Sequence, residues 1–121
     1  MSGFIKGSQK LIFGKNAGVI KDNRIATVQT FSGTGALRTG FDFIKEYFPK
    51  NVVIPEPTWP NHERIIRHAG VPISFYQYYD PTTKKVDLKG IVNSLEKTQE
   101  GNIVLFQVCA HNPTATDPTP E

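Results

Sequence analysis

The stretch that constrains the fold most is NIVLFQVCA, residues 102–110, in which apolar residues follow one another almost without interruption. A strand with one face in solvent alternates apolar and polar residues, whereas a strand covered on both faces is apolar along its length. The run therefore predicts a central strand of a sheet that has helices packed against both faces.

Three shorter segments earlier in the chain also have the composition of strands. They are IATVQTF (25–31), NVVIP (51–55) and VPISFYQYY (71–79), and the last is stopped by the turn signal Asp80-Pro81. The segment 25–31 is rich in β-branched residues and lies between the turn-like KDNR and SGTG, which is typical of a strand.

Helical periodicity fills the intervals between these segments. The apolar stripes are Leu37, Phe41, Ile44 and Phe48, ended by Pro49; Ile65, Ile66 and Ala69, followed by Gly70; and Leu88, Ile91, Val92 and Leu95, preceded by the N-cap candidate Asp87. Gly70 lies where a left-handed helix cap is expected. Strands alternating with helices predict an α/β fold with a mostly parallel sheet and right-handed crossovers.

The length and charge of the chain exclude several classes of protein. Its 121 residues suit a single domain, and no segment approaches the roughly 18 to 20 apolar residues that a membrane-spanning helix needs. The net charge is +3 and the basic residues are scattered, so neither nucleic acid nor a membrane is the expected partner. Cys109 is the only cysteine, so no internal disulfide can form.

Functional sites of parallel α/β sheets lie at the carboxyl ends of the strands. Three polar loops occupy these positions: SGTG after 25–31, PEPTWPNH after 51–55, and HNPT after 102–110. We therefore expect any ligand site of this chain to be built from these loops.

The first loop, SGTG, has two readings. The free N–H groups at a helix start favour an anion such as phosphate, with Gly33 and Gly35 allowing close approach and the hydroxyls of Ser32 and Thr34 available to donate. The alternative is a capped helix packed closely on its strand. The run matches no nucleotide motif, because Arg38 occupies the place of the third glycine of GxGxxG and no GK[ST] follows.

The second loop carries Trp59, the only tryptophan, and His62. An indole face can stack on a flat ring, although Trp59 could equally cap the edge of the core. His62 could titrate near neutral pH or orient a carboxylate, or it could be structural.

The third loop carries Asn112 directly before a proline, which favours an extended backbone that would aim its amide into a cleft. Cys109 and His111 are possible metal ligands, but without a second cluster they do not predict a zinc site.

Four segments, in this order and at this spacing, resemble the aspartate aminotransferases, which are class I pyridoxal-phosphate-dependent aminotransferases. They are VQTFSGTGALRTG, PTWPNH, YYDPTTKKVDLKG and VCAHNPTATDPTPE, and the resemblance extends from about Phe4 to Glu121. It implies a three-layer sandwich that is part of the large domain of that fold. We expect a helical or loop segment at 1–24 and a partial large, cofactor-binding domain at 25–121.

The resemblance also implies roles for individual residues. Ser32, Gly33 and Thr34 match positions that hold the phosphate of pyridoxal 5'-phosphate. Trp59 matches the tryptophan that stacks on the pyridine ring and helps to bind the substrate carboxylate. Asn112 matches the asparagine that binds the cofactor's phenolic oxygen and contacts the substrate carboxylate.

Two further features are implied by the same resemblance. His62 matches a histidine that supports the aspartate beneath the pyridine nitrogen. The peptide bonds Glu56-Pro57 and Asn112-Pro113 are expected to be cis.

This chain departs from the family in three ways. No lysine occupies the position of the Schiff-base lysine, so the catalytic residue is expected to lie outside this segment. Ala115 replaces the glycine usual after HNPT and would be strained if its φ is positive. Gln107 stands where many relatives have histidine.

The implied function is amino transfer between L-aspartate and 2-oxoglutarate by a cytoplasmic homodimer with amino-acid and 2-oxo-acid substrates; the family also has mitochondrial forms. We expect the given chain to be part of this enzyme and inactive alone. The alternatives are a truncated, non-catalytic remnant that binds phosphate or a subunit, and an aromatic-amino-acid aminotransferase of the same subgroup.

Overall fold

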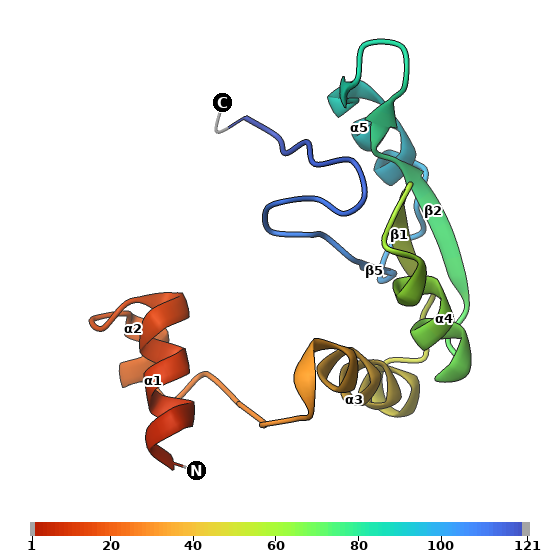
Figure 1. The fold of residues 1–121 in the computed structure, drawn as a ribbon. Coiled ribbons are helices and arrows are strands. Elements are labelled where there is room, and N and C mark those ends of the chain that lie inside the picture. Colours follow the sequence, from red (N-terminus) through yellow and green to blue (C-terminus); the bar gives the residue numbers. More distant parts are fainter. Residues whose placement is uncertain (1, 120–121) are drawn as a thin grey trace. The chain divides into compact units, whose positions relative to one another are not determined.

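The computed structural model describes residues 2–119. They form two compact units with the boundary between Ala36 and Leu37. The first unit holds α1 (Ser2–Phe13), α2 (Gly18–Lys21) and the start of α3 (Ser32–Tyr47), whose remainder belongs to the second unit (Figure 1). Among the described residues, no helix combines the length and the apolar character needed to cross a membrane.

The strand predicted at 25–31 is wrong, because within residues 2–119 this segment pairs with no strand. Its apolar side chains are exposed, with Val28 at 75% and Phe31 at 94% of full accessibility. A side-chain bond from Gln9 Nε2 to Thr27 Oγ1, 2.8 Å long, connects the segment to α1. β-branched residues favour an extended backbone, but a strand also needs a partner for its hydrogen bonds, and sequence composition does not supply one.

The second unit is built on a three-stranded parallel sheet in the order β2-β1-β5 (Figure 1). Its strands are β1 (Val52–Glu56), β2 (Ile73–Gln77) and β5 (Ile103–Val104), and Val52 pairs with both Ile73 and Ile103. The prediction of a mostly parallel α/β sheet is therefore confirmed. The expected strand at 71–79 divides into β2 and β3 (Tyr79–Asp80), and β3 forms an antiparallel pair with β4 (Lys85–Val86).

The central strand of the described sheet is β1 and not the run at 102–110, which corrects the prediction. Only two residues of that run form strand, and the bond from Leu105 N to Val53 O, 2.9 Å long, extends the pairing by one step. Phe106 and Val108 of the run are 58% and 98% exposed, so its continuous apolar character predicts neither burial on both faces nor the number of neighbouring strands.

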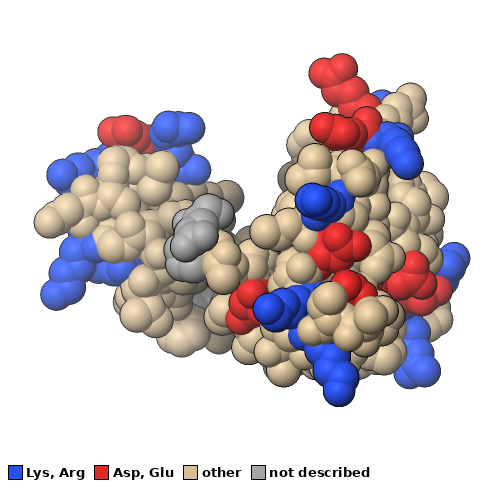
Figure 2. Space-filling model, turned by 90° about the horizontal axis from the view of Figure 1, so that it is seen from above, with Lys and Arg blue, Asp and Glu red and all other residues tan. Residues whose placement is uncertain are grey.

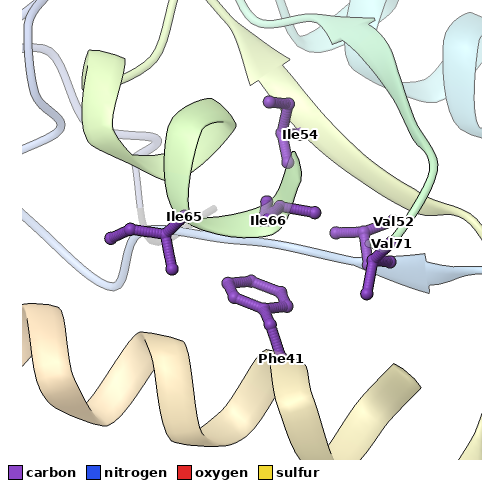
Figure 3. Close-up of a cluster of buried hydrophobic side chains, with 6 residues drawn as sticks. All are labelled: Phe41, Val52, Ile54, Ile65, Ile66 and Val71. Carbon is purple, nitrogen blue, oxygen red and sulfur yellow. The ribbon is translucent and has the colours of Figure 1, made fainter. Parts of the chain in front are cut away.

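Helices cover both faces of the sheet. Val52 and Ile54 of β1 pack with Phe41 of α3 and with Ile65 and Ile66 of α4 (Pro60–His68), as Figure 3 shows. The opposite face carries Val53 and Tyr76, which pack with Ile91 of α5 (Leu88–Glu96). Alternation along β1 thus gives the three layers that the resemblance implied.

The predicted helix signals are also found. Asp87 caps α5, with its carboxylate accepting a 2.8 Å bond from Gly90 N. Gly70 follows α4 with φ +73°, in the left-handed region.

Charged side chains of both signs are interspersed on the face of the second unit drawn in Figure 2. Two ion pairs lie along helix surfaces, Arg38 with Asp42 at 2.8 Å and Arg67 with Glu63 at 2.9 Å. Both are exposed and contribute little to stability. Asp42 and Glu63 therefore belong to solvent-exposed helix faces.

Candidate functional site

The start of α3 carries the SGTG loop. Ser32, Gly33 and Thr34 are exposed in the first turn, and the bond from Gly35 N to Phe31 O, 3.0 Å long, is the first to join successive turns. The N–H groups before it have no partner within the helix and are available to an anion. A Cβ added to Gly33 would meet nothing within 4 Å, so packing within the described part of the first unit does not require glycine there.

Trp59 immediately precedes α4, at the carboxyl end of β1. Its indole is half-buried against the core cluster around Val52 and meets His62 edge-on, with ring centroids 5.3 Å apart. The tryptophan therefore covers the edge of the core while part of the ring stays accessible.

His62 lies beneath Trp59 and is 8% exposed. Its Nδ1 is 2.8 Å from Thr58 Oγ1, so one ring nitrogen is engaged by the preceding loop. Burial, together with the neighbouring His111, lowers the pKa of His62 below the ordinary value for histidine. The imidazole is therefore held in its neutral form near pH 7.

Asn112 lies in the loop that follows β5. Its backbone N–H donates to Gln107 Oε1 at 2.9 Å, and its carbonyl accepts from Gln107 Nε2 at 3.1 Å. Its side chain is exposed and has no hydrogen-bond partner among residues 2–119. The peptide bonds Glu56-Pro57 and Asn112-Pro113 are both cis, as the resemblance implied.

A compact hydrogen-bonded network supports this loop from below. His111 is 1% exposed, its ring stacks on Tyr78 with centroids 3.7 Å apart, and its Nδ1 lies 2.9 Å from Thr114 Oγ1. Asp117 accepts bonds from Ala110 N at 2.6 Å and His111 N at 2.9 Å. These bonds lower the pKa of Asp117, so the carboxylate stays ionised as the loop forms.

Sequence reasoning missed this network. His111 was weighed only as a metal ligand, and Tyr78 and Asp117 were given no role. The available signal was an aspartate a few residues after Asn112 in a Pro- and Thr-rich loop, where carboxylates often accept backbone N–H groups.

The backbone of the same loop is strained at two alanines. Ala110 has φ 51° and Ala115 has φ 52°, in the left-handed region that alanine rarely adopts. The φ of Ala115 is therefore positive, and alanine is strained at this position, as expected from the sequence for that case. Ala115 N donates a 2.7 Å bond to His111 O, which holds the strained turn closed.

The loops that carry Trp59 and Asn112 follow the carboxyl ends of the adjacent strands β1 and β5, and Gln107 Nε2 lies 3.5 Å from Thr58 Oγ1 in the first loop and 3.1 Å from Asn112 O in the second. The indole of Trp59 offers a face and the amide of Asn112 offers both a donor and an acceptor. The neighbouring His62 and His111 are both buried, and each engages a threonine hydroxyl through Nδ1, while His111 Nε2 has no hydrogen-bond partner within the described residues. Such an arrangement suits the binding of a flat ring that carries a hydrogen-bonding oxygen.

The chain is similar to named proteins along nearly its whole length. The cytoplasmic aspartate aminotransferase of Oryza sativa is 46% identical over 120 residues, which is 98% of this chain and 30% of that protein. The chain thus spans about a third of the length of this relative.

Solved structures give the same result. A mitochondrial aspartate aminotransferase from Trypanosoma brucei has a TM-score of 0.95 and 42% identity over 99% of this chain and 32% of its own. An aromatic-amino-acid aminotransferase from Burkholderia pseudomallei, covalently bound to pyridoxal phosphate, has a TM-score of 0.96 and 36% identity over 99% and 30%. Finally, the family model described as aminotransferase class I and II matches residues 4–121. The chain belongs to the class I and II aminotransferase family.

Proposed function

We propose that this chain supplies the cofactor-binding part of an aspartate aminotransferase, which transfers an amino group between L-aspartate and 2-oxoglutarate with pyridoxal 5'-phosphate. Support comes from the family match over residues 4–121 and from the 46% identity to a relative that carries this name. The activity, the substrates and a homodimeric assembly are properties proposed for the whole protein.

The observation that carries the proposal is that the side-chain amide of Asn112 is free within residues 2–119 whereas its backbone N–H and carbonyl are hydrogen-bonded. The amide of Asn112 is exposed and without a partner in the described chain, while its backbone is fully bonded. Such an amide fits the phenolic oxygen of pyridoxal phosphate and a substrate carboxylate. The accessible part of Trp59 fits the pyridine ring.

The start of α3, taken by itself, fits a phosphate group such as that of pyridoxal phosphate. Ser32, Gly33 and Thr34 present backbone N–H groups and hydroxyls at an exposed helix start. The open space at Gly33 supports the proposal, since no described side chain of the first unit excludes a Cβ there. Glycine at this position is then explained by the close approach of a bound anion.

When bound, pyridoxal phosphate supplies the electron sink for chemistry at the substrate α-carbon. The residues of this chain bind and orient. Asn112 would donate an amide N–H to the phenolic oxygen, Trp59 would stack on the pyridine ring, and neutral His62 would support the carboxylate that pairs with the pyridine nitrogen. No lysine of the chain stands at the position of the family's catalytic lysine, so we propose that the 121-residue chain alone has no transaminase activity.

A second candidate is an aromatic-amino-acid aminotransferase, favoured by the likeness to the Burkholderia pseudomallei structure at a TM-score of 0.96. The location we propose is cytoplasmic, in line with the Oryza sativa relative, while the Trypanosoma brucei relative is mitochondrial. Neither nucleic acid nor a membrane is a partner in this proposal.

The experiment is a chimera in which residues 4–121 replace the matching segment of the Oryza sativa enzyme. We expect the chimera to bind pyridoxal phosphate and to convert aspartate and 2-oxoglutarate, measured by coupling oxaloacetate to NADH oxidation. Asn112→Ala should lower kcat/KM by at least about ten-fold, as expected for a lost hydrogen bond to a charged group. A folded chimera without activity would support the non-catalytic alternative, and higher kcat/KM with phenylalanine than with aspartate would support the aromatic one.

A further inference from the structure

Gln107 makes an unusual pair of contacts three residues after β5. Its side-chain amide binds both backbone polar groups of one residue, with Oε1 accepting from Asn112 N at 2.9 Å and Nε2 donating to Asn112 O at 3.1 Å. The orientation of the amide is fixed by chemistry, because an N–H must face the oxygen and a carbonyl must face the nitrogen. Gln107 thus takes the place of a neighbouring strand where strand pairing has ended.

The consequence concerns the side chain of Asn112. Asparagine readily hydrogen-bonds to backbone groups of its own loop, which would withdraw its amide from a ligand. Here both backbone groups of Asn112 are occupied by Gln107, and the Asn112 amide remains exposed. The two bonds also restrict φ and ψ of Asn112, so the direction in which its Cα–Cβ bond leaves the backbone is defined before any ligand binds.

Gln107 also reaches the loop after β1. Its Nε2 lies 3.5 Å from Thr58 Oγ1, a long contact, and Thr58 Oγ1 lies 2.8 Å from His62 Nδ1. One side chain therefore connects the loop that carries Trp59 with the loop that carries Asn112.

We propose that Gln107 is a positioning residue that holds Asn112 in the orientation needed to bind the cofactor. The inference rests on the proposed function for the role of Asn112, but the clamp itself is a property of this chain. Gln107 acts through Asn112 and is not assigned contact with the cofactor or the substrate.

The first test measures the clamp in the 121-residue chain. Gln107→Met keeps the length of the side chain but removes both bonds, and we expect hydrogen exchange at Asn112 N–H to become about three- to ten-fold faster. Gln99→Met is the matched control. Gln99 precedes β5 in the sequence, is exposed to solvent, and makes no side-chain hydrogen bond within the described residues. Equal exchange in the wild type and in Gln107→Met overturns the proposal.

The second test separates positioning from general stability, using the chimera loaded with pyridoxal phosphate. If Gln107 acts through Asn112, Gln107→Met lowers kcat/KM in the wild-type background but causes no further loss when Asn112 is already alanine. An equal additional loss in both backgrounds shows a merely structural role and contradicts the inference.

The two tests also separate this inference from the proposed function. If Asn112 has no role in the cofactor site, Asn112→Ala leaves the chimera unchanged while the exchange effect of Gln107→Met persists. If the clamp is absent, the exchange rates coincide while Asn112→Ala still impairs the enzyme.

Discussion

Replacing Ala115 by glycine should stabilise the chain. The left-handed conformation at φ 52° costs an L-residue about 1–2 kcal/mol, and glycine removes this cost. Glycine also gives the unfolded chain more freedom, which opposes the gain by about 0.5–1 kcal/mol. Ala115 is exposed, so little packing is lost with its methyl group. The expected net effect of Ala115→Gly is a gain of about 0.5–1 kcal/mol in the free energy of unfolding.

The assay is urea unfolding followed by the fluorescence of Trp59, the only tryptophan. Ala69→Gly provides the control, because Ala69 has φ −77°, where alanine is unstrained. There the same chemical change should lower the free energy of unfolding by about 0.5–1 kcal/mol or more, since Ala69 also packs against the core. If Ala115→Gly and Ala69→Gly shift the urea midpoint in the same direction, the positive φ of Ala115 does not strain the chain.

Four other outcomes are expected. Ile66→Ala should lower the free energy of unfolding by about 2–5 kcal/mol in urea titrations, because Ile66 is fully buried. Asp117→Asn should speed hydrogen exchange at one of the amides of Ala110 and His111, since the asparagine oxygen can replace one carboxylate oxygen but its NH₂ group cannot accept the other bond. Burial lowers the pKa of His62 and of His111, so the unfolded chain binds more protons than the folded chain just below pH 6.5, and thermal melts should show stability falling as the pH drops from about 6.5. Gly33→Val in the chimera should weaken pyridoxal phosphate binding, measured by equilibrium dialysis, without lowering the melting temperature of the cofactor-free protein, because valine is no less favourable than glycine in a helix.

The parts of the fold that depend on local periodicity were predictable from the sequence. The helix caps at Asp87 and Gly70, the stripe that contains Phe41, and the buried run of β1 are all encoded within a few residues. Strand pairing is non-local, and two errors came from it. The segment 25–31 has the composition of a strand but no partner, and the run 102–110 forms only the short strand β5 at the edge of the described sheet.

The candidate site divides in the same way. The side chains facing outward, Trp59 and Asn112, were identified because their loops follow strands and resemble a known family. The groups that support them were not, since the stack of His111 on Tyr78 joins residues far apart in the sequence. The carboxylate of Asp117 likewise acts on backbone groups that carry no side-chain signature.

The proposed function depends most directly on the side-chain amide of Asn112, which would donate an N–H to the phenolic oxygen of pyridoxal phosphate. A donated N–H stabilises the deprotonated phenol and its conjugated system, so its removal should raise the pH at which the visible absorption band of the bound cofactor titrates. We predict that Asn112→Leu in the chimera moves this midpoint upward, that Gln107→Met moves it in the same direction, and that Asn93→Leu on the exposed surface of α5 leaves it unchanged. If the Asn112→Leu chimera has the same titration midpoint as the unsubstituted chimera, Asn112 does not donate to the phenolic oxygen and the proposed function of this site is contradicted.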